Sequence, residues 1–371
     1  MVLDMIRTMS MEVNFFTVHD TGDNQITCSP SGQSNRVHRL AFHGAKVKHD
    51  ASIKMGHVRS FSAITCSNSG MPPLSIFNVL RVLVIEDCVL SEDLSMKNLG
   101  KLVQLRYLGL VNTSVELPED IGVNLKFLEI LDVRGGSISE LPPSVGELQK
   151  LRCLLADKGT RMKGEIGKLT CLEELQLEHV DKVPNFFRDV GKLIKLRMLS
   201  IVLDRLEHTA AKVLAVSLLN LHKIQDLFIK TNEVKLLSDL FNIELLVCAG
   251  SLEELTPSSR LRFFGLQRIL TTKMPSWINA LSVSLLSVLM LYVEVVEAQD
   301  LQILGRLPSL IELSFFSAEK KCVSYTFGSD EFQKLRLLAT NVEITLREGA
   351  LPMLKKPIYS ASAGRKDSLV T

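Results

Sequence analysis

The stretch LRVLVIEDCVL, residues 80–90, places its apolar residues at offsets of three and then two, which no single face of a helix would keep together. It fits the pattern L-x-x-L-x-L-x-x-[N/C]-x-L at each fixed position, with Ile85 in place of one leucine. The same frame returns at Leu105, Leu128 and Leu151, with successive starts 23 to 25 residues apart. Self-similarity at this spacing predicts a chain built from stacked coils.

The frame recurs along most of the chain. Further copies, some of them weak, begin at Val37, Val58, Leu172, Leu196, Ile224, Leu261, Leu286, Leu310, Leu335 and Leu354. The gap between Ile224 and Leu261 is too long for one unit, and a degenerate copy at Ile243 would fill it. The sequence therefore predicts about 14 to 15 irregular units.

Within each copy, the second and third apolar residues lie two apart, so they point to one face of a short strand. We expect such strands at 83–85, 108–110, 131–133, 154–156, 175–177, 199–201 and 227–229. A helical solenoid is the alternative, but prolines recur after the strands at Pro118, Pro142, Pro184 and Pro275, which disfavours it.

The pattern is that of leucine-rich repeats, and it predicts an α/β solenoid. We expect an irregular horseshoe with a parallel β-sheet on the concave face and loops or short helices on the convex face. We expect irregularity because most copies lack Asn or Cys at the position of the motif whose side chain normally satisfies backbone groups of neighbouring coils. That position reads Cys88, Thr113, Gly136, Gly159, Val180, Asp204 and Asn232.

Composition narrows the function. The 371 residues are 46% hydrophobic and carry 43 basic against 41 acidic side chains, while aromatic residues are only 6%. Such a chain can bury a large core, and it lacks the basic, aromatic-rich surface typical of nucleic-acid binding. Seven scattered cysteines indicate neither a disulfide framework nor a zinc site. No apolar run is long enough for a membrane span, so we expect a cytoplasmic protein.

No catalytic constellation emerges, so we expect no enzyme activity, no cofactor and no metal. The spacing of His38, His43, His49 and His57 matches no familiar ligand pattern. The Gly135-Gly136 pair more plausibly relieves backbone strain than cradles a phosphate. Trp277, the single tryptophan, is expected to pack in the core of the convex side.

The concave face is the candidate protein-binding site, because its side chains are held on a rigid sheet without a packing role. The middle coils place acidic residues on neighbouring strands, with basic residues on either side, and complementary charge can set specificity. A merely solvated face is the alternative for any single residue. The candidates are Arg106, Tyr107, Glu129, Asp132, Arg134, Arg152, Glu173, Glu174, Glu178, Arg197, Asp226, Phe228 and Lys230.

Several segments go beyond the general repeat. ELPEDIG (116–122), ELPPSVG (140–146), MPSWI (274–278) and GALPMLKK (349–356) resemble segments of plant nucleotide-binding leucine-rich-repeat disease-resistance proteins, of the coiled-coil class found in grasses. Pro357 stands where that family has a leucine, and proline is tolerated mainly in an edge strand. MVLDMIR (1–7) and EVNFFTV (12–18) resemble the stretch that follows the MHD motif of the family's winged-helix domain.

The resemblance implies a domain organisation. Residues 1–36 would be a remnant following the winged-helix motif and a linker, residues 37–359 the leucine-rich-repeat domain, and residues 360–371 a disordered tail. No G-x-x-x-x-G-K-[ST] phosphate-binding loop occurs in the chain, so no nucleotide site is carried over.

The resemblance also implies a function. In the family the repeat domain senses a ligand and restrains a nucleotide-binding switch domain. The partners would be a pathogen effector, a guarded host protein or that switch domain, with no nucleic acid and no membrane span. A leucine-rich-repeat adaptor or scaffold unrelated to immunity is the alternative, and an inhibitor that regulates an enzyme is a third possibility.

Overall fold

The structure is a computed structural model. It describes residues 16–19, 38–43, 55–66, 72–88, 96–157, 159–236, 258–271, 273–318, 325–342, 344–347 and 350–359. The chain forms two compact units, Met1–Pro184 (unit 1) and Asn185–Thr371 (unit 2), and each is described separately. The degenerate copy expected at Ile243, the stretch at 1–7 and the tail at 360–371 lie outside the described residues.

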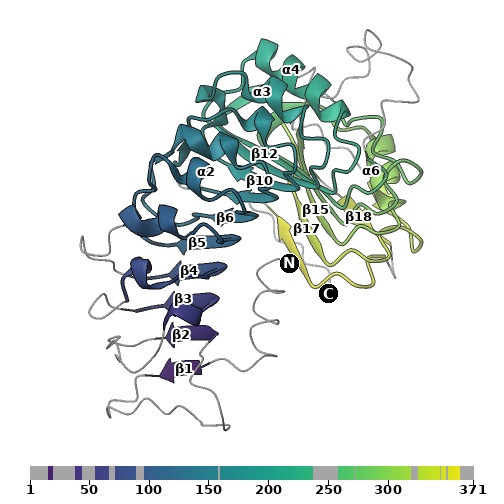
Figure 1. Ribbon diagram of the computed structural model, residues 1–371. Helices are drawn as coiled ribbons and strands as arrows, with labels where there is room; N and C mark the ends of the chain where they lie inside the picture. Colours follow the sequence, from purple (N-terminus) through teal and green to yellow (C-terminus); the bar gives the residue numbers. More distant parts are fainter. Residues whose placement is uncertain are drawn as a thin grey trace. The chain divides into compact units, whose positions relative to one another are not determined.

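Unit 1 is a parallel sheet with one strand from each coil, as the strands drawn one above another in Figure 1 show. In sheet order the strands are β1 (Phe16–His19), β2 (Arg39–His43), β3 (Ser60–Ile64), β4 (Val82–Glu86), β5 (Tyr107–Val111), β6 (Ile130–Asp132), β8 (Cys153–Leu155) and β10 (Glu174–Leu177). The leucines of the repeat are in register, with Leu83 opposite Leu108 and Leu108 opposite Leu131.

Short helices and turns return the chain of unit 1 from one strand to the next. They include η1 (Met55–His57), η2 (Leu74–Ile76), η3 (Met96–Lys101), α2 (Ile121–Asn124), η4 (Pro143–Glu147), η5 (Ile166–Lys168) and η6 (Val180–Lys182). The two ELP segments belong here, with Ile121 and Val145 fully buried under the returning chain. A small parallel pair, β7 (Glu140–Leu141) and β9 (Arg161–Met162), joins two of these returns.

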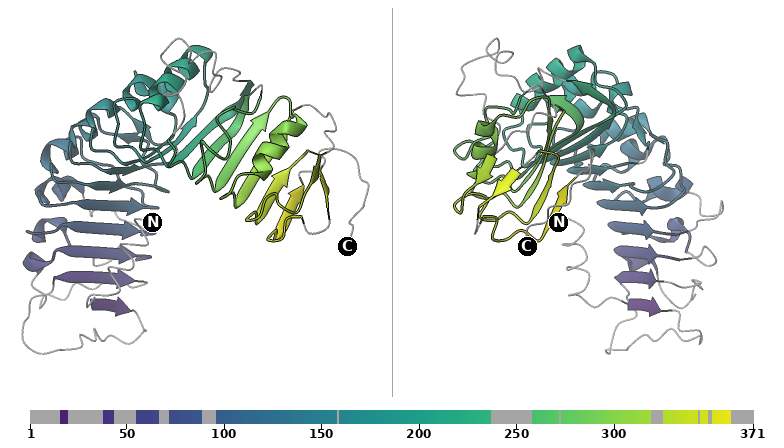
Figure 2. Two further views of the ribbon diagram at one scale, coloured as in Figure 1. Left: turned by 90° about the vertical axis from the view of Figure 1, so that its right-hand side faces the viewer. Right: turned by 180° about the vertical axis from the view of Figure 1, so that it is seen from behind.

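Unit 2 repeats the design with strands that lie side by side in Figure 2, and those from β11 to β15 are longer than the strands of unit 1. They are β11 (Met198–Leu203), β12 (Asp226–Leu236), β13 (Phe263–Thr271), β14 (Val288–Val293), β15 (Glu312–Ser317), β17 (Leu337–Thr340) and β19 (Lys356–Tyr359). The returning segments contain α3 (Phe186–Val190), α4 (His208–Leu219), α6 (Ala298–Gly305) and the pair β16 (Tyr325–Phe327) with β18 (Ile344–Leu346).

The core of each unit lies between the sheet and the returning segments. In β4 and β11, every second side chain is buried and the intervening ones are partly exposed. Trp277 is buried, as expected, and packs edge-on against Phe264 with ring centroids 5.0 Å apart. All the strands expected from the repeat in these two sheets are present and parallel, so the solenoid prediction is confirmed.

The turns that follow the strands explain part of the irregularity. Thr65, Asp87 and Asn112 each take a left-handed conformation, with φ between 51° and 53°. Next to them, the Cys88 Sγ donates to the Ala63 and Glu86 carbonyls, and the Thr113 Oγ1 donates to the Leu110 carbonyl. Such side chains satisfy the backbone where the strand ends.

The ladder of turn side chains is broken further along, as expected. Gly136 and Val180 have no polar side chain, and in the coil containing Gly159 the neighbouring Thr160 makes the backbone hydrogen bonds instead. In unit 2 the register shifts between β12 and β13 and again between β13 and β14. Gly135, with φ of 75°, relieves a strained turn, which was the expected role of the glycine pair.

The two ends of the sheet sequence add detail. Strand β1 lies within residues 1–36, which were expected to be a winged-helix remnant and a linker, and it pairs in parallel with β2, so a strand precedes the boundary expected at residue 37. At the other end, β19 forms although Pro357 replaces the usual leucine. It is the last strand of its sheet, which is where proline is tolerated.

Candidate protein-binding surface

The outer face of each sheet carries the side chains that alternate with the core residues. In unit 1 this face holds Tyr107, Asp132 and Glu174, and in unit 2 it holds Asp226, Phe228 and Lys230. The predicted candidates are therefore divided between the two units.

Four candidates form a row along the N-terminal ends of the unit 1 strands, each one residue ahead of its strand. Backbone hydrogen bonds link each residue to its counterpart in the preceding coil. The amides of Glu129, Arg152 and Glu173 donate to the carbonyls of Arg106, Glu129 and Arg152, respectively. Their side chains form ion pairs at 2.9 Å, Arg106 with Glu129 and Arg152 with Glu173. The edge row therefore neutralises much of the acidic centre that the sequence suggested.

The row continues into earlier coils with two residues that were not among the predicted candidates. Arg59 and Arg81 occupy the same position in earlier coils, since the amides of Arg81 and Arg106 bond the carbonyls of Arg59 and Arg81. Both arginines are exposed. The signal was in the sequence, because each follows the first apolar residue of its repeat, as Arg106 does.

Tyr107 was expected to stand free on the concave face, and this expectation was wrong. It is buried, and its ring lies over Gly109 so closely that a Cβ on that glycine would be 2.9 Å from the tyrosine Cε1. Burial, together with the nearby Asp132 carboxylate, raises the pKa of the Tyr107 hydroxyl. A glycine two residues along the strand allows this ring to fold down onto the sheet.

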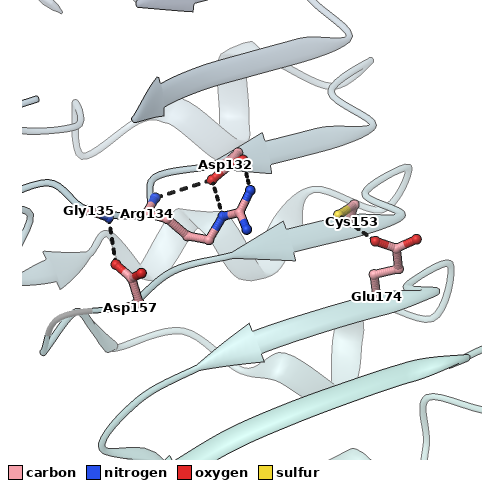
Figure 3. A network of polar contacts seen from close by, with 6 residues as sticks. All are labelled: Asp132, Arg134, Gly135, Cys153, Asp157 and Glu174. Atoms are coloured by element: carbon pink, nitrogen blue, oxygen red, sulfur yellow. Dashed lines mark hydrogen bonds and ion pairs between the residues drawn. The ribbon is translucent and has the colours of Figure 1, made fainter. Parts of the chain in front are cut away.

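Asp132 was likewise expected at the surface, but it is 0% exposed. Figure 3 shows the reason. The Arg134 Nε and Nη2 donate to the two carboxylate oxygens at 2.9 and 2.7 Å, and the Arg134 amide donates to the same group at 3.2 Å. A buried carboxylate persists only with such partners. Asp132 is therefore a structural residue of the outer face.

The neighbouring polar groups also serve the fold. The Asp157 carboxylate accepts from the Gly135 amide at 2.6 Å, and the Glu178 carboxylate accepts from the Gly159 amide at 3.1 Å. The Cys153 thiol donates to Glu174 at 3.5 Å (Figure 3), and burial raises its pKa, so it stays a protonated donor. Three predicted binding acids, Asp132, Glu174 and Glu178, thus hold turns or neighbours in place.

In unit 2 the outer face carries a cluster of apolar side chains. The Phe228 and Phe263 rings meet edge to face, with centroids 6.1 Å apart. They border a hollow of about 420 Å³, called here the unit 2 hollow. Its lining residues are Met198, Leu199, Ser200, Asp226, Phe228, Phe263, Gln267 and Met290.

The strands explain why the hollow forms at this place. Phe228 on β12 lies opposite Ser200 on β11 and opposite Gly265 on β13, so a large side chain has small neighbours on both sides. A Cβ on Gly265 would lie 2.8 Å from the Phe228 ring. Arg197 lies at the adjacent edge of the sheet, and its carbonyl accepts from the Asp226 amide.

The sequence identified Asp226 and Phe228 but missed the other apolar lining residues. Phe263 and Met290 occupy the outer-face positions of the repeats that begin at Leu261 and Leu286. The repeat frame would have located them, yet the register that brings them beside Phe228 depends on the pairing of β12 with β13.

The described residues offer no cluster for a metal ion. Among them, no group of three His, Cys, Asp or Glu side chains comes close enough to hold a metal ion. The four cysteines in the described ranges, Cys66, Cys88, Cys153 and Cys171, are free thiols. Within the same ranges, no helix is both long and apolar enough to cross a membrane.

Comparisons with known proteins agree with the fold. A family model described as a leucine-rich repeat region matches residues 57–367. Among solved structures, an internalin from Listeria monocytogenes superposes with a TM-score of 0.57 at 16% identity, over 89% of this chain and 88% of that one. At that identity the likeness concerns the fold alone.

The similar curated proteins are plant proteins. Disease resistance protein PIK6-NP of Oryza sativa subsp. japonica is 27% identical in an alignment 405 residues long, gaps included. The alignment covers 96% of this chain and 36% of that protein. Disease resistance protein Pik-2 of the same organism is 28% identical over 350 residues, covering 85% of this chain and 33% of that protein. The chain spans about a third of the length of these relatives. The chain belongs to the leucine-rich-repeat family, and its repeat region is similar to those of rice disease resistance proteins.

Proposed function

We propose that this chain is the protein-interaction domain of a plant intracellular immune receptor, acting in the cytoplasm in the response to pathogens. The observation that carries the proposal is the similarity of almost the whole chain to about a third of two rice disease resistance proteins. The outer faces of its sheets support the same reading, because they offer a rigid surface with charged and apolar zones.

The proposed activity is binding without catalysis. The chain has no phosphate-binding loop in its sequence. The ionisable groups of the outer face in unit 1 are engaged in ion pairs or backbone contacts rather than arranged around a reacting atom. The proposed partners are a pathogen effector, a guarded host protein, or a nucleotide-binding switch domain of the same receptor.

The receptor assignment is tested on the transcript that encodes this chain. We expect its reading frame to encode a nucleotide-binding domain joined to the repeats. A complete transcript that encodes only leucine-rich repeats would contradict the receptor assignment and favour an adaptor or scaffold.

The binding assignment is tested with purified proteins. Calorimetry of the chain with ATP and Mg²⁺ should show no saturable heat, whereas the separately produced nucleotide-binding domain should be retained by the immobilised chain. Without the covalent linker, this contact should be weaker by roughly 10²–10⁴-fold than within one receptor. Saturable ATP binding, or no association at concentrations up to the millimolar range, would contradict the proposal.

A further inference from the structure

The unit 2 hollow is an apolar concavity with aromatic walls on the outer face of unit 2. Phe228 and Phe263 form two walls, and the flexible side chains of Met198 and Met290 form others. At about 420 Å³ the hollow is near the small end of the ~300–1,000 Å³ of pockets that hold small ligands. The hollow therefore has room for one large side chain.

Its walls suit an aromatic side chain in particular. Aromatic rings gain from edge-to-face contact with other rings, and methionine sulfur makes favourable contacts with ring edges. Methionine can also adapt its shape to the ring that enters. Gly265 has no side chain, so the Phe228 and Phe263 rings can both pack against the strand there.

The charges around the hollow are predominantly basic. Arg262 directly precedes Phe263 and is exposed, and Lys230 lies opposite the lining residue Gln267. Arg268 follows Gln267, is exposed, and donates through Nη1 to the Asn232 carbonyl. At the same strand ends as Arg262, Arg197 and Asp226 carry opposite charges that offset each other. An approaching acidic segment would meet complementary charge on both sides of the apolar centre.

We propose that the unit 2 hollow receives an aromatic side chain of a partner protein, within a segment whose flanking residues are acidic. The proposal rests on the proposed protein-binding function and specifies the chemistry of the partner at this site. The aromatic ring would bury its apolar surface in the hollow. The flanking carboxylates would face Arg262 on one side and Lys230 with Arg268 on the other. A central apolar anchor with a polar rim is the usual arrangement of a binding hot spot.

The test uses the full chain labelled with ¹³C at its methionine methyl groups and observed by NMR. The probe is an acetylated, amidated pentapeptide with phenylalanine at its centre and glutamate at every other position, titrated to millimolar concentration. We expect saturable shifts of the Met198 and Met290 methyl signals. The signal of Met353, which is 54% exposed in the turn before β19, should stay unchanged.

Two altered peptides test the chemistry on the unmodified chain. Replacing the central phenylalanine by alanine should weaken binding roughly 10- to 100-fold, because the buried ring is lost. Replacing the glutamates by lysines should weaken binding by about tenfold or more, with a smaller difference at high salt. Absence of saturable shifts at both methionines, or equal binding of the acidic and basic peptides, would overturn the proposal.

Variants of the chain provide the matched comparison. Phe228→Ala and Arg262→Glu should weaken binding of the acidic peptide. Phe316→Ala changes an outer-face ring outside the lining, and Arg336→Glu changes an exposed arginine at the corresponding edge position of β17, so both should bind normally. If the receptor's nucleotide-binding domain still binds the chain while the peptide does not, this inference fails and the proposed function stands.

Discussion

Leu131 and Asp132 are consecutive residues of β6 that point to opposite faces of the sheet, and neither has any exposed surface. Leu131 is one of the stacked core leucines, opposite Leu108 and Leu154. Asp132 is covered on the outer face and is held by Arg134, whose side chain is 31% exposed. The two residues are therefore buried for different reasons, apolar packing and ion pairing.

Substitutions at these residues should differ in the size of their effect. Leu131→Asp places a charge without a partner in the core and should lower the free energy of unfolding by roughly 4 kcal/mol or more. Asp132→Ala removes hydrogen bonds to a charged group and should cost about 1–3 kcal/mol, because the partly exposed Arg134 can regain water. Urea unfolding followed by circular dichroism measures both.

The matched control is Glu165→Ala, which removes a carboxylate that is 70% exposed in its ion pair with Lys168. Its effect should stay within about 0.5 kcal/mol. An Asp132→Ala variant that unfolds at the same urea concentration as Glu165→Ala would show that Asp132 is an ordinary surface residue.

Because the Cys88 thiol is buried, we expect the protein to lose stability at alkaline pH. Burial raises the pKa of this thiol from 9.0 to about 11. Because the folded-state pKa is the higher one, the contribution to stability is complete below pH 9 and is lost as the pH rises from 9 to 11. Urea midpoints measured between pH 8 and pH 11 should fall more steeply for the native chain than for Cys88→Ser, and parallel profiles would be inconsistent with a buried thiol.

At this scale the sequence predicts the face of a side chain better than its exposure. The period of two within each repeat correctly assigns Tyr107 and Asp132 to the outer face. Whether such a residue is covered depends on its neighbours, here the missing side chain of Gly109 and the position of Arg134. A fixed repeat pattern carries no information about how two side chains of one face fold onto each other.

The turns that end the strands are the elements most sensitive to small changes. Gly135 has a φ of 75°, and a Cβ there would lie 1.7 Å from the Asn112 Oδ1. Gly135→Ala should therefore combine left-handed strain with a clash that Asn112 must relieve, at a cost of about 1–3 kcal/mol. Differential scanning fluorimetry should show a clear decrease in melting temperature.

Gly328→Ala is the control for this prediction. The nearest atom to an added Cβ at Gly328 is the Glu331 Oε2, at 3.9 Å, which is ordinary contact. This variant should melt near the native temperature. A Gly135→Ala variant with the same melting temperature as Gly328→Ala would contradict the strained geometry of the turn.

Among the elements, the strands were the most predictable and the irregularities were not. Each strand expected in the middle of the chain begins one residue before its expected start, because its core leucines must face the returning chain. Strand β1 was not anticipated, since its residues do not fit the full repeat. The register shifts of β13 depend on the left-handed Arg268, which no repeat position would suggest.

For the whole molecule, the repeat period decided the fold, and the proline-containing ELP segments indicated the kind of plant protein it resembles. The candidate site was predicted less well. The carboxylates of its acidic centre form ion pairs, Arg106–Glu129, Arg152–Glu173 and Arg134–Asp132. The unit 2 hollow is lined instead by residues from four strands, β11, β12, β13 and β14. Partner chemistry lies in side chains that the repeat leaves unconstrained.

The central claim is that the outer faces of the sheets bind protein. Hydroxyl-radical footprinting of the chain, alone and with the nucleotide-binding domain encoded by the same transcript, tests it most directly. In the presence of the nucleotide-binding domain, we expect reduced oxidation of outer-face residues, namely Met198, Phe228 and Met290 in unit 2 or Val82 and Val84 in unit 1. We also expect unchanged oxidation of the exposed Phe127 and Met353, in the turns before β6 and β19. Protection confined to those turns, with every outer-face residue oxidised as in the chain alone, would contradict the claim.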